Sequence, residues 1–248
     1  MRVKLFFTCL FLAIAGTAWG SGIILNEYNA VKGSEYLKKS GSDTYWGRVK
    51  GNGGDWFEMV VITDHLDMRN WRLDIYEDGA KSNTLKLTDA SIWSDLRSGT
   101  IITVSEDMAD DVSYNPSAGD WWINVQANDT ASGTYIEAES FPVNGKDWQL
   151  TIKDANKNVV FGPAGEGVNP TKGVSSTEIC KLEENPSASI TPLSNYNDGS
   201  SSTFGAPNKW DSGTKVQDFS TLRSVVPEPV SALLLAMGGL MIRRKRRQ

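Results

Sequence analysis

The chain has 248 residues, with 25 Lys and Arg against 30 Asp and Glu, and a formal net charge of −5. Seven of the positive residues lie in the first four positions or in 243–247. The body between these ends keeps 18 positive and 29 negative residues, once Glu228 is left out with the tail. An acidic body argues against non-specific nucleic-acid binding, which needs positive charge to displace counterions. Two cysteines exclude a fold built on several disulfides.

The first 20 residues have the order of a secretory signal peptide. Two cations lie in the first four residues, 5–15 is apolar, and Ala18-Trp19-Gly20 supplies the small residues that precede a cleavage site. We expect cleavage between Gly20 and Ser21, and cleavage after Ala18 is the alternative.

The next 160 or so residues contain short apolar runs separated by frequent turn signals, a pattern typical of an all-β protein. Alternation of apolar and polar residues is clearest from Trp71 to Tyr76 and from Trp148 to Lys153. A single helical stretch of one or two turns is expected within 89–96, with Asp89 as its N-cap. The predicted strands are 23–28, 55–62, 71–76, 84–87, 100–105, 121–126, 148–153, 159–161 and 178–182.

From residue 183 the composition changes. Ser, Asn, Pro and Gly dominate up to residue 225, so this segment is expected to be a poorly ordered closing segment and stalk. The predicted divisions are therefore a signal peptide (1–20), a β domain (22–182), a flexible segment (183–225) and a C-terminal tail (226–248).

The tail has three parts in a fixed order. Pro227, Glu228 and Pro229 hold the chain extended, 230–242 is apolar, and a basic run follows. As a helix the apolar part would reach roughly 20 Å, against about 30 Å of hydrocarbon, so it is a poor permanent anchor. The basic run should stay cytoplasmic and place everything before it outside. That run is Arg243, Arg244, Lys245, Arg246 and Arg247.

This order resembles a PEP-CTERM sorting signal, which occurs in bacterial proteins handed to a membrane protease called exosortase. The resemblance implies processing near Pro227-Glu228-Pro229 and release or re-anchoring outside the cell. Two alternatives are a plain tail anchor and a nuclear-localisation run, and the signal peptide disfavours the second.

A second resemblance covers about 22–210. The stretches Ile24-Leu25-Asn26-Glu27, Asp55-Trp56-Phe57-Glu58-Met59 and Leu66 to Leu73 resemble the opening motifs of the lamin-tail domain family, and 202–208 resembles its closing motif. The resemblance implies an immunoglobulin-like β-sandwich of the lamin-tail type that acts as a structural or binding module. Val61, Asn70 and the long 107–145 region depart from the family pattern.

The residues expected to define this fold are Asn26, Glu27, Trp56, Glu58, Trp71 and Leu73. Trp56 and Trp71 are expected to fill the space between two sheets, because large aromatic side chains dominate such cores. Glu27 and Glu58 are either buried, paired carboxylates or two solvent-facing glutamates, and the sequence does not separate these readings.

No residue set in the body points to catalysis. His65 is the single histidine, and no nucleophile motif accompanies it. No cofactor is expected. Calcium is a weak alternative at the acidic residues Asp107, Asp110, Asp111 and Asp120, which lack the spacing of a calcium loop. Cys180 is expected to be buried.

The leading hypothesis is an exported, non-enzymatic β-sandwich module delivered to the bacterial cell envelope or extracellular matrix. Its expected partners are the secretion machinery, the sorting protease, and extracellular polysaccharide or envelope proteins, with no nucleic acid. Membrane contact is expected through 230–242, which would first hold the protein in the inner membrane. The alternative is a secreted hydrolase or a carbohydrate-binding module that uses acidic or aromatic surface residues, such as one of Trp121 and Trp122.

Overall fold

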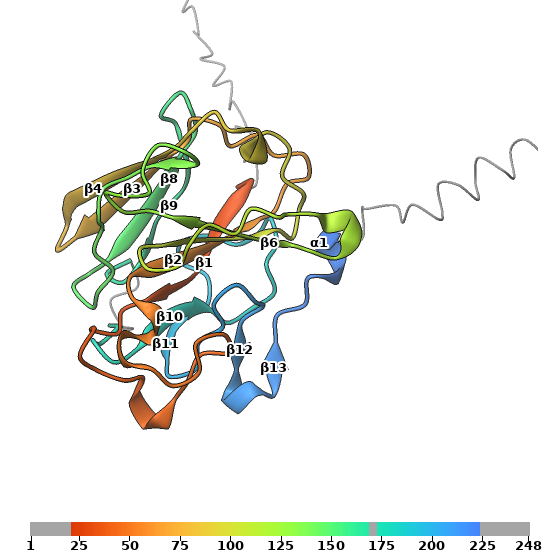
Figure 1. Ribbon diagram of the computed structural model, residues 1–248. Coiled ribbons are helices and arrows are strands. Elements are labelled where there is room, and N and C mark those ends of the chain that lie inside the picture. Colours follow the sequence, from red (N-terminus) through yellow and green to blue (C-terminus); the bar gives the residue numbers. More distant parts are fainter. Residues whose placement is uncertain (1–20, 169–172, 224–248) are drawn as a thin grey trace, which may run out of the picture.

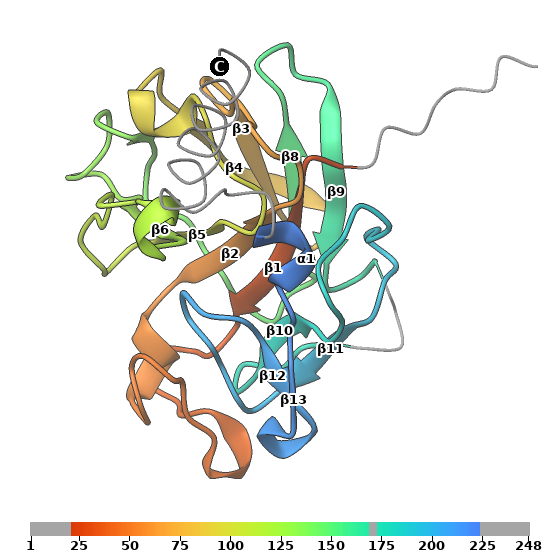
Figure 2. The ribbon, with the colours of Figure 1, turned by 90° about the vertical axis from the view of Figure 1, so that its right-hand side faces the viewer.

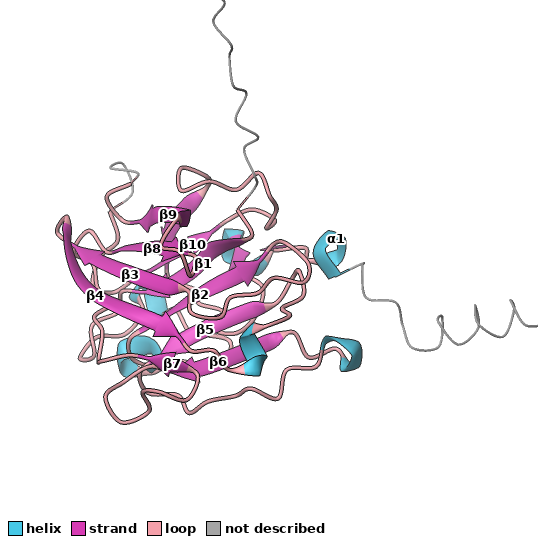
Figure 3. Cartoon of the chain, turned by 90° about the horizontal axis from the view of Figure 1, so that it is seen from above, coloured by secondary structure: helices cyan, strands magenta, loops and turns pink. Residues whose placement is uncertain are grey.

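The computed structural model describes residues 21–168 and 173–223. The predictions for the signal peptide before Ser21 and for the C-terminal tail lie outside these residues. Within them, two β-sheets pack face to face as a sandwich (Figure 1). Helices are confined to short pieces at the periphery (Figure 3).

The first sheet has six strands in the order β11-β10-β1-β2-β5-β6. All its pairings are antiparallel except β5 with β6, which is parallel. Its three central strands are buried along their whole length, although polar residues such as Asn26, Glu27 and Glu58 interrupt their apolar runs. The strands are β1 (Ile23–Asn29), β2 (Trp56–Val61), β5 (Ile101–Ser105), β6 (Trp122–Gln126), β10 (Ile179–Leu182) and β11 (Tyr196–Gly199).

The second sheet has five strands in the order β7-β4-β3-β8-β9, all paired antiparallel. One face packs on the first sheet and the other faces water, so alternation is clear in its sequence. Its strands are β3 (Arg72–Glu77), β4 (Ala80–Leu87), β7 (Ile136–Glu137), β8 (Gln149–Lys153) and β9 (Val159–Gly165).

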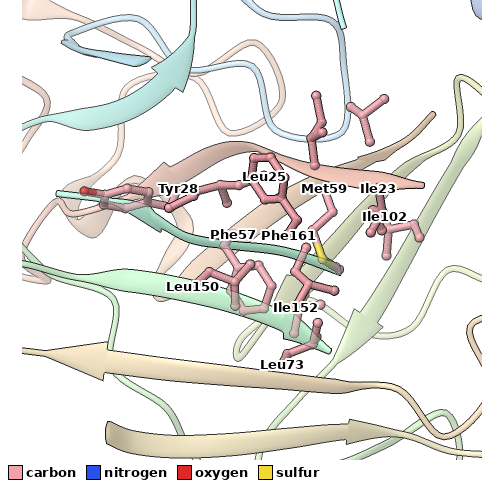
Figure 4. Packing of buried hydrophobic residues seen from close by; sticks show 14 of the residues in the cluster. Ile23, Leu25, Tyr28, Phe57, Met59, Leu73, Ile102, Leu150, Ile152 and Phe161 are labelled. Carbon is pink, nitrogen blue, oxygen red and sulfur yellow. The ribbon is translucent and has the colours of Figure 1, made fainter. Parts of the chain in front are cut away.

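The main core lies between the two sheets. In Figure 4, Leu25, Phe57 and Met59 of the first sheet point toward Leu150 and Ile152 of the second, and all five are fully buried. Burying a side chain of this size contributes roughly 1.5–3 kcal/mol. Trp71 and Leu73 both belong to this cluster.

Trp56 corrects one prediction. It is fully buried but does not belong to the core between the sheets. Side chains alternate along β2, and Phe57 takes the inner position, where its ring contacts Trp148. Trp56 therefore lies on the outer face of the six-stranded sheet, with its ring centroid 5.0 Å from that of Phe204.

The closing segment differs most from expectation. Instead of forming a poorly ordered stalk, 183–223 contributes the edge strand β11 and the hairpin β12 (Lys209–Trp210) and β13 (Lys215–Val216). It ends in one turn of helix, α1 (Ser220–Arg223). Between these elements it crosses the outer face of the six-stranded sheet, which is why that face is also buried. The predicted boundary at 182 therefore cuts through one packed unit.

The remaining regular pieces are short 3₁₀ helices in the loops. The helical stretch expected within 89–96 is one of them, Ser91–Trp93. The others are Lys38–Ser40, Lys50–Gly53, Pro116–Ala118 and Asp211–Gly213.

Candidate functional site

A buried polar layer lies between the six-stranded sheet and the closing segment. Its members are all buried, although residues of these types are usually exposed. The polar layer consists of Asn26, Glu27, Glu58, Lys181, Thr203, Asn208 and Gln217.

The two carboxylates of the layer come from neighbouring strands, because Glu27 of β1 is paired with Glu58 of β2. The Glu58 carboxylate accepts hydrogen bonds from Asn26 Nδ2 at 2.6 Å and from Gly205 N at 2.9 Å. A β-bulge between Leu25 and Glu27 inserts Asn26 into β1, and bulges of this kind re-aim side chains. The reading in which Glu27 and Glu58 face solvent is therefore wrong.

The Thr203 hydroxyl decides where a proton is needed. Its oxygen lies 2.7 Å from Glu27 Oε2 and 3.0 Å from Asn208 Oδ1. One hydroxyl proton cannot serve two acceptors, whereas a protonated Glu27 can donate to Thr203, which then donates to Asn208. The Asn208 oxygen must be an acceptor, since its Nδ2 donates to Asn26 O and Leu182 O.

The electrostatic environment also favours one proton shared by Glu27 and Glu58. Burial raises the pKa of Glu27 to about 7, and the Lys181 ammonium acts in the opposite direction. Burial, followed by the nearby Glu27 charge, also raises the pKa of Glu58. Two buried carboxylates this close share one proton near neutral pH, as like charges disfavour each other's ionisation. The hydrogen bonds place that proton on Glu27 Oε2, because both Glu58 oxygens and Glu27 Oε1 accept from N–H groups.

Lys181 and Gln217 connect the layer to the backbone of the closing segment. Lys181 Nζ donates to Ser201 O at 2.8 Å, Ser201 Oγ at 2.9 Å and Lys209 O. Gln217 Nε2 donates to Asn26 Oδ1 at 2.9 Å, and its Oε1 accepts from Asn208 N at 3.0 Å. The layer therefore fastens the segment to β1, β2 and β10.

Aromatic side chains seal this layer on the side of the 41–54 loop. Phe204 is buried, and its ring lies within 5.0–5.8 Å of four other rings. Asp43 fixes the arrangement by accepting hydrogen bonds from Phe204 N at 3.0 Å and Tyr45 N at 2.6 Å. The four rings are those of Tyr45, Trp46, Trp56 and Trp122.

This layer is therefore built to hold the chain together, and substrate cannot reach it. Both carboxyl groups of the pair are fully buried under residues of the closing segment. A hollow of about 490 Å³ lies elsewhere, over β4 and β7, and is lined by polar residues such as Asn83, Ser132 and Glu137.

The other candidate residues are not arranged for catalysis. His65 Nδ1 lies 2.6 Å from Asp95 Oδ1, and its Nε2 lies 3.5 Å from Asp64 Oδ2, so both ring nitrogens face carboxylates. A triad histidine must keep one nitrogen for the nucleophile. Across 21–168 and 173–223, no three or more His, Cys, Asp or Glu side chains are grouped to hold a metal.

Trp121 and Trp122, considered above as an aromatic platform, are both partly buried and each has a packing partner. The Arg223 guanidinium lies 5.0 Å from the Trp121 ring centroid. Trp122 packs against Phe204 and donates from Nε1 to Thr103 Oγ1 at 3.0 Å.

Helix α1, the last turn that the structure describes, is held against the sandwich by hydrogen bonds. Arg223 Nη2 donates to Gly99 O at 2.9 Å, and Ser98 Oγ donates to Leu222 O at 2.5 Å. Gly99 N in turn donates to Val61 O, at the end of β2 where Gly22 also lies. The chain therefore enters the sandwich at Gly22 and leaves it at Arg223 from the same end of the six-stranded sheet.

The structure brings together four of the predicted fold-defining residues, Asn26, Glu27, Trp56 and Glu58, on one sheet face. Sequence reasoning missed their partners Lys181, Thr203, Asn208 and Gln217. The closing-motif resemblance at 202–208 was the signal that pointed toward two of them. The sorting-motif residues Pro227, Glu228 and Pro229 and the basic run lie outside the described residues.

Comparison with known proteins returned no matching family model, no matching curated protein and no matching solved structure. Among the described residues, no helix has the length and apolar character needed to span a bilayer.

Proposed function

We propose that this protein is an exported, non-enzymatic binding or structural module that a C-terminal sorting signal delivers to the bacterial cell envelope. In this proposal its body is an immunoglobulin-like sandwich of the lamin-tail type. One observation carries the proposal: Gly22 and Arg223 leave the body at the same end of the six-stranded sheet. A membrane-directed segment at either terminus would then hold that end toward the bilayer and present the opposite end outward.

The short distance between body and sorting motif supports this arrangement. Arg223 is fixed by its contacts with Gly99 and with the Phe219 and Trp121 rings. Pro227 is only four residues further along, at most about 14 Å of extended chain. Processing would therefore occur close to the surface of the folded body.

The non-enzymatic part of the proposal rests on the polar layer. Its carboxyl groups have raised pKa values, which are common at catalytic sites but also occur in structural networks. Here Thr203 and Gly205 of the closing segment cover them, so the structural role accounts for the shifts. The same covering disfavours a hydrolase that would use Glu27 and Glu58.

The test is mass spectrometry of both termini after expression in a bacterium that carries an exosortase, combined with cell fractionation. We expect a new N-terminus at Ser21, or at Trp19 for the alternative site, and loss of the basic run from the envelope or medium fraction. The double change Pro227→Ala with Pro229→Ala should retain the uncut tail. Pro192→Ala, within the closing segment, is the matched control and should be processed normally. An uncut protein in the cytoplasm would overturn the proposal.

A further inference from the structure

A cluster of exposed cations and aromatic rings occupies the loop between β1 and β2. Tyr36 and Tyr45 are 38% and 52% exposed, and the neighbouring Val49 is 39% exposed. Four cations are exposed on the same loop, against one exposed acid, Glu35. We call this surface the basic aromatic patch; it consists of Lys32, Tyr36, Lys39, Tyr45, Arg48, Val49 and Lys50.

The patch cations differ from seven other cations of the described residues, which are paired with carboxylates. For example, Lys86 lies 3.0 Å from Glu137, and Lys153 lies 2.6 Å from Asp74. Within the part of the chain that the structure describes, the four patch cations form no ion pair with a carboxylate. Two of them lie over an aromatic ring instead, with Arg48 Cζ at 4.5 Å and Lys50 Nζ at 5.9 Å from the Tyr36 centroid. Their charge is therefore available to an external anion.

The loop that carries the patch is held rigid. Asn29 Nδ2 donates to Gly51 O at 2.8 Å and to Gly54 O at 2.6 Å. Trp56 Nε1 donates to Asn52 O at 3.0 Å. These buried contacts fix the loop before any ligand arrives, which lowers the entropic cost of binding.

The patch also lies away from the end where the chain enters and leaves. The loop joins the sheet at Asn29 and Trp56, whereas Gly22 and Arg223 lie at the other end of β1 and β2. Six or seven residues of strand separate the two ends by about 20 Å. Figure 2 shows the loop in orange at the bottom of the molecule, with the chain reaching β1 from above.

We propose that the basic aromatic patch binds an acidic polysaccharide of the uronic-acid type. Arg48 presents a planar fork suited to a sugar carboxylate, and the exposed lysines add point charges. Tyr45 offers exposed ring surface to the apolar faces of the sugars, and the Tyr36 ring positions Arg48 and Lys50. The choice of an extracellular polymer over the bilayer rests on the proposed function, in which this end of the sheet points away from the membrane.

Charge density disfavours a nucleic acid as the occupant. Double-stranded DNA carries one negative charge per about 1.7 Å of its axis. A uronic-acid polymer carries one carboxylate per sugar, and sugars are several times longer than that spacing. A body with 18 positive and 29 negative residues repels the denser polyanion more strongly.

The experiment measures binding of polygalacturonate oligomers to the purified protein by calorimetry in about 0.15 M salt, where the Debye length is about 8 Å. Neutral dextran, single-stranded DNA and phosphatidylglycerol vesicles are the comparison probes. We expect polygalacturonate to bind most tightly. Arg48→Ala with Lys50→Ala should weaken binding roughly tenfold, and Tyr36→Ala should weaken it several-fold. Arg48→Lys, which keeps the positive charge and loses the planar guanidinium, should weaken binding by an intermediate amount.

The matched control is Lys86→Ala with Lys157→Asn. It removes the same charge from strand β4 and from the turn between β8 and β9, and it should leave binding unchanged. Thermal unfolding of each variant checks that the fold is intact. No binding of polygalacturonate, equal loss in the control, or tighter binding to DNA or vesicles would each overturn the proposal. Since binding is measured on purified protein, such a result leaves the export proposal standing whenever the termini are processed as expected.

Discussion

At the scale of single residues, the feature that stands out is a buried carboxylic acid whose neutral form completes a hydrogen-bond chain. Glu27 donates to Thr203 only when protonated, and Thr203 can then donate to Asn208. An unsatisfied buried polar group costs about 1–3 kcal/mol, so the protonation state of Glu27 affects the stability of the whole polar layer.

The first prediction concerns pH. The pKa of Glu27 is about 7 in the folded protein and close to 4.5 when the chain is unfolded. Between these values the folded state binds more protons, so the free energy of unfolding falls as pH rises. The change is on the order of 3 kcal/mol. Glu27→Gln, which mimics the neutral acid by donating from its amide, should make this fall smaller. Burial also raises the pKa of Asp55 to about 7 and raises that of Glu58, so these two carboxyls keep part of the fall. Urea unfolding at about pH 5 and about pH 8 measures it.

The control for this prediction is the exposed Glu35→Gln, which should keep the wild-type slope. Asp64 and Asp74 act with the opposite sign. Burial alone would raise their pKa values, but hydrogen bonds and the nearby positive charges, chiefly those of Arg97 and of Lys153 respectively, together lower them. Their stabilisation is present above the unfolded pKa and is lost as pH falls further, so it does not mask the Glu27 effect above about pH 5. A slope in Glu27→Gln as steep as that of the wild type would contradict the assignment.

At the scale of elements, the strands of the sandwich were predictable and the closing segment was not. Each of the nine predicted strands overlaps an observed one, because alternation and β-branched runs report directly on burial against a sheet. Residues 183–223 carry few apolar side chains. They are ordered by hydrogen bonds to a distant sheet face, and no local period in the sequence records such bonds.

The placement of Trp56 shows, at a single position, the same limit of prediction from sequence. Trp56 and Phe57 are adjacent large aromatics, so alternation requires them to face opposite sides without deciding which side is the core. Since Phe204 and the 41–54 loop cover the outer face, both positions are buried. The sequence alone therefore leaves the faces of the two rings open, and their assignment needed the three-dimensional pairing.

The second prediction tests whether the polar layer stabilises the fold. Asn208→Ala removes the donors to Asn26 O and Leu182 O and the acceptor of Thr203. We expect a loss of about 3 kcal/mol in the free energy of unfolding, because several buried groups lose partners together. Asn156→Ala, in the exposed hairpin turn between β8 and β9, is the matched control and should change it by less than about 0.5 kcal/mol. Similar values for both variants would show that the segment is dispensable.

At the scale of the whole molecule, the closing segment makes the six-stranded sheet part of an interior. Strand β10 pairs with β1 on one side and β11 on the other. Its residue Cys180 is buried, as expected from the sequence, and burial raises the pKa of its thiol to about 12. A thiol in this state is neither accessible nor ionised, so it reacts only when the sheet opens.

The third prediction uses this thiol as a probe of the whole fold. Labelling of Cys180 with a thiol reagent should be slow in the native protein and should follow the population of the open state when reclosing is fast. Asn208→Ala should then speed labelling on the order of a hundredfold, which corresponds to about 3 kcal/mol at 1.4 kcal/mol per factor of ten. Asn156→Ala should label at the native rate. The contradicting result is an Asn208→Ala protein that is destabilised in urea but labelled no faster. That result would mean that the polar layer and the six-stranded sheet open independently, and that the closing segment does not belong to the same cooperative unit as the sheet.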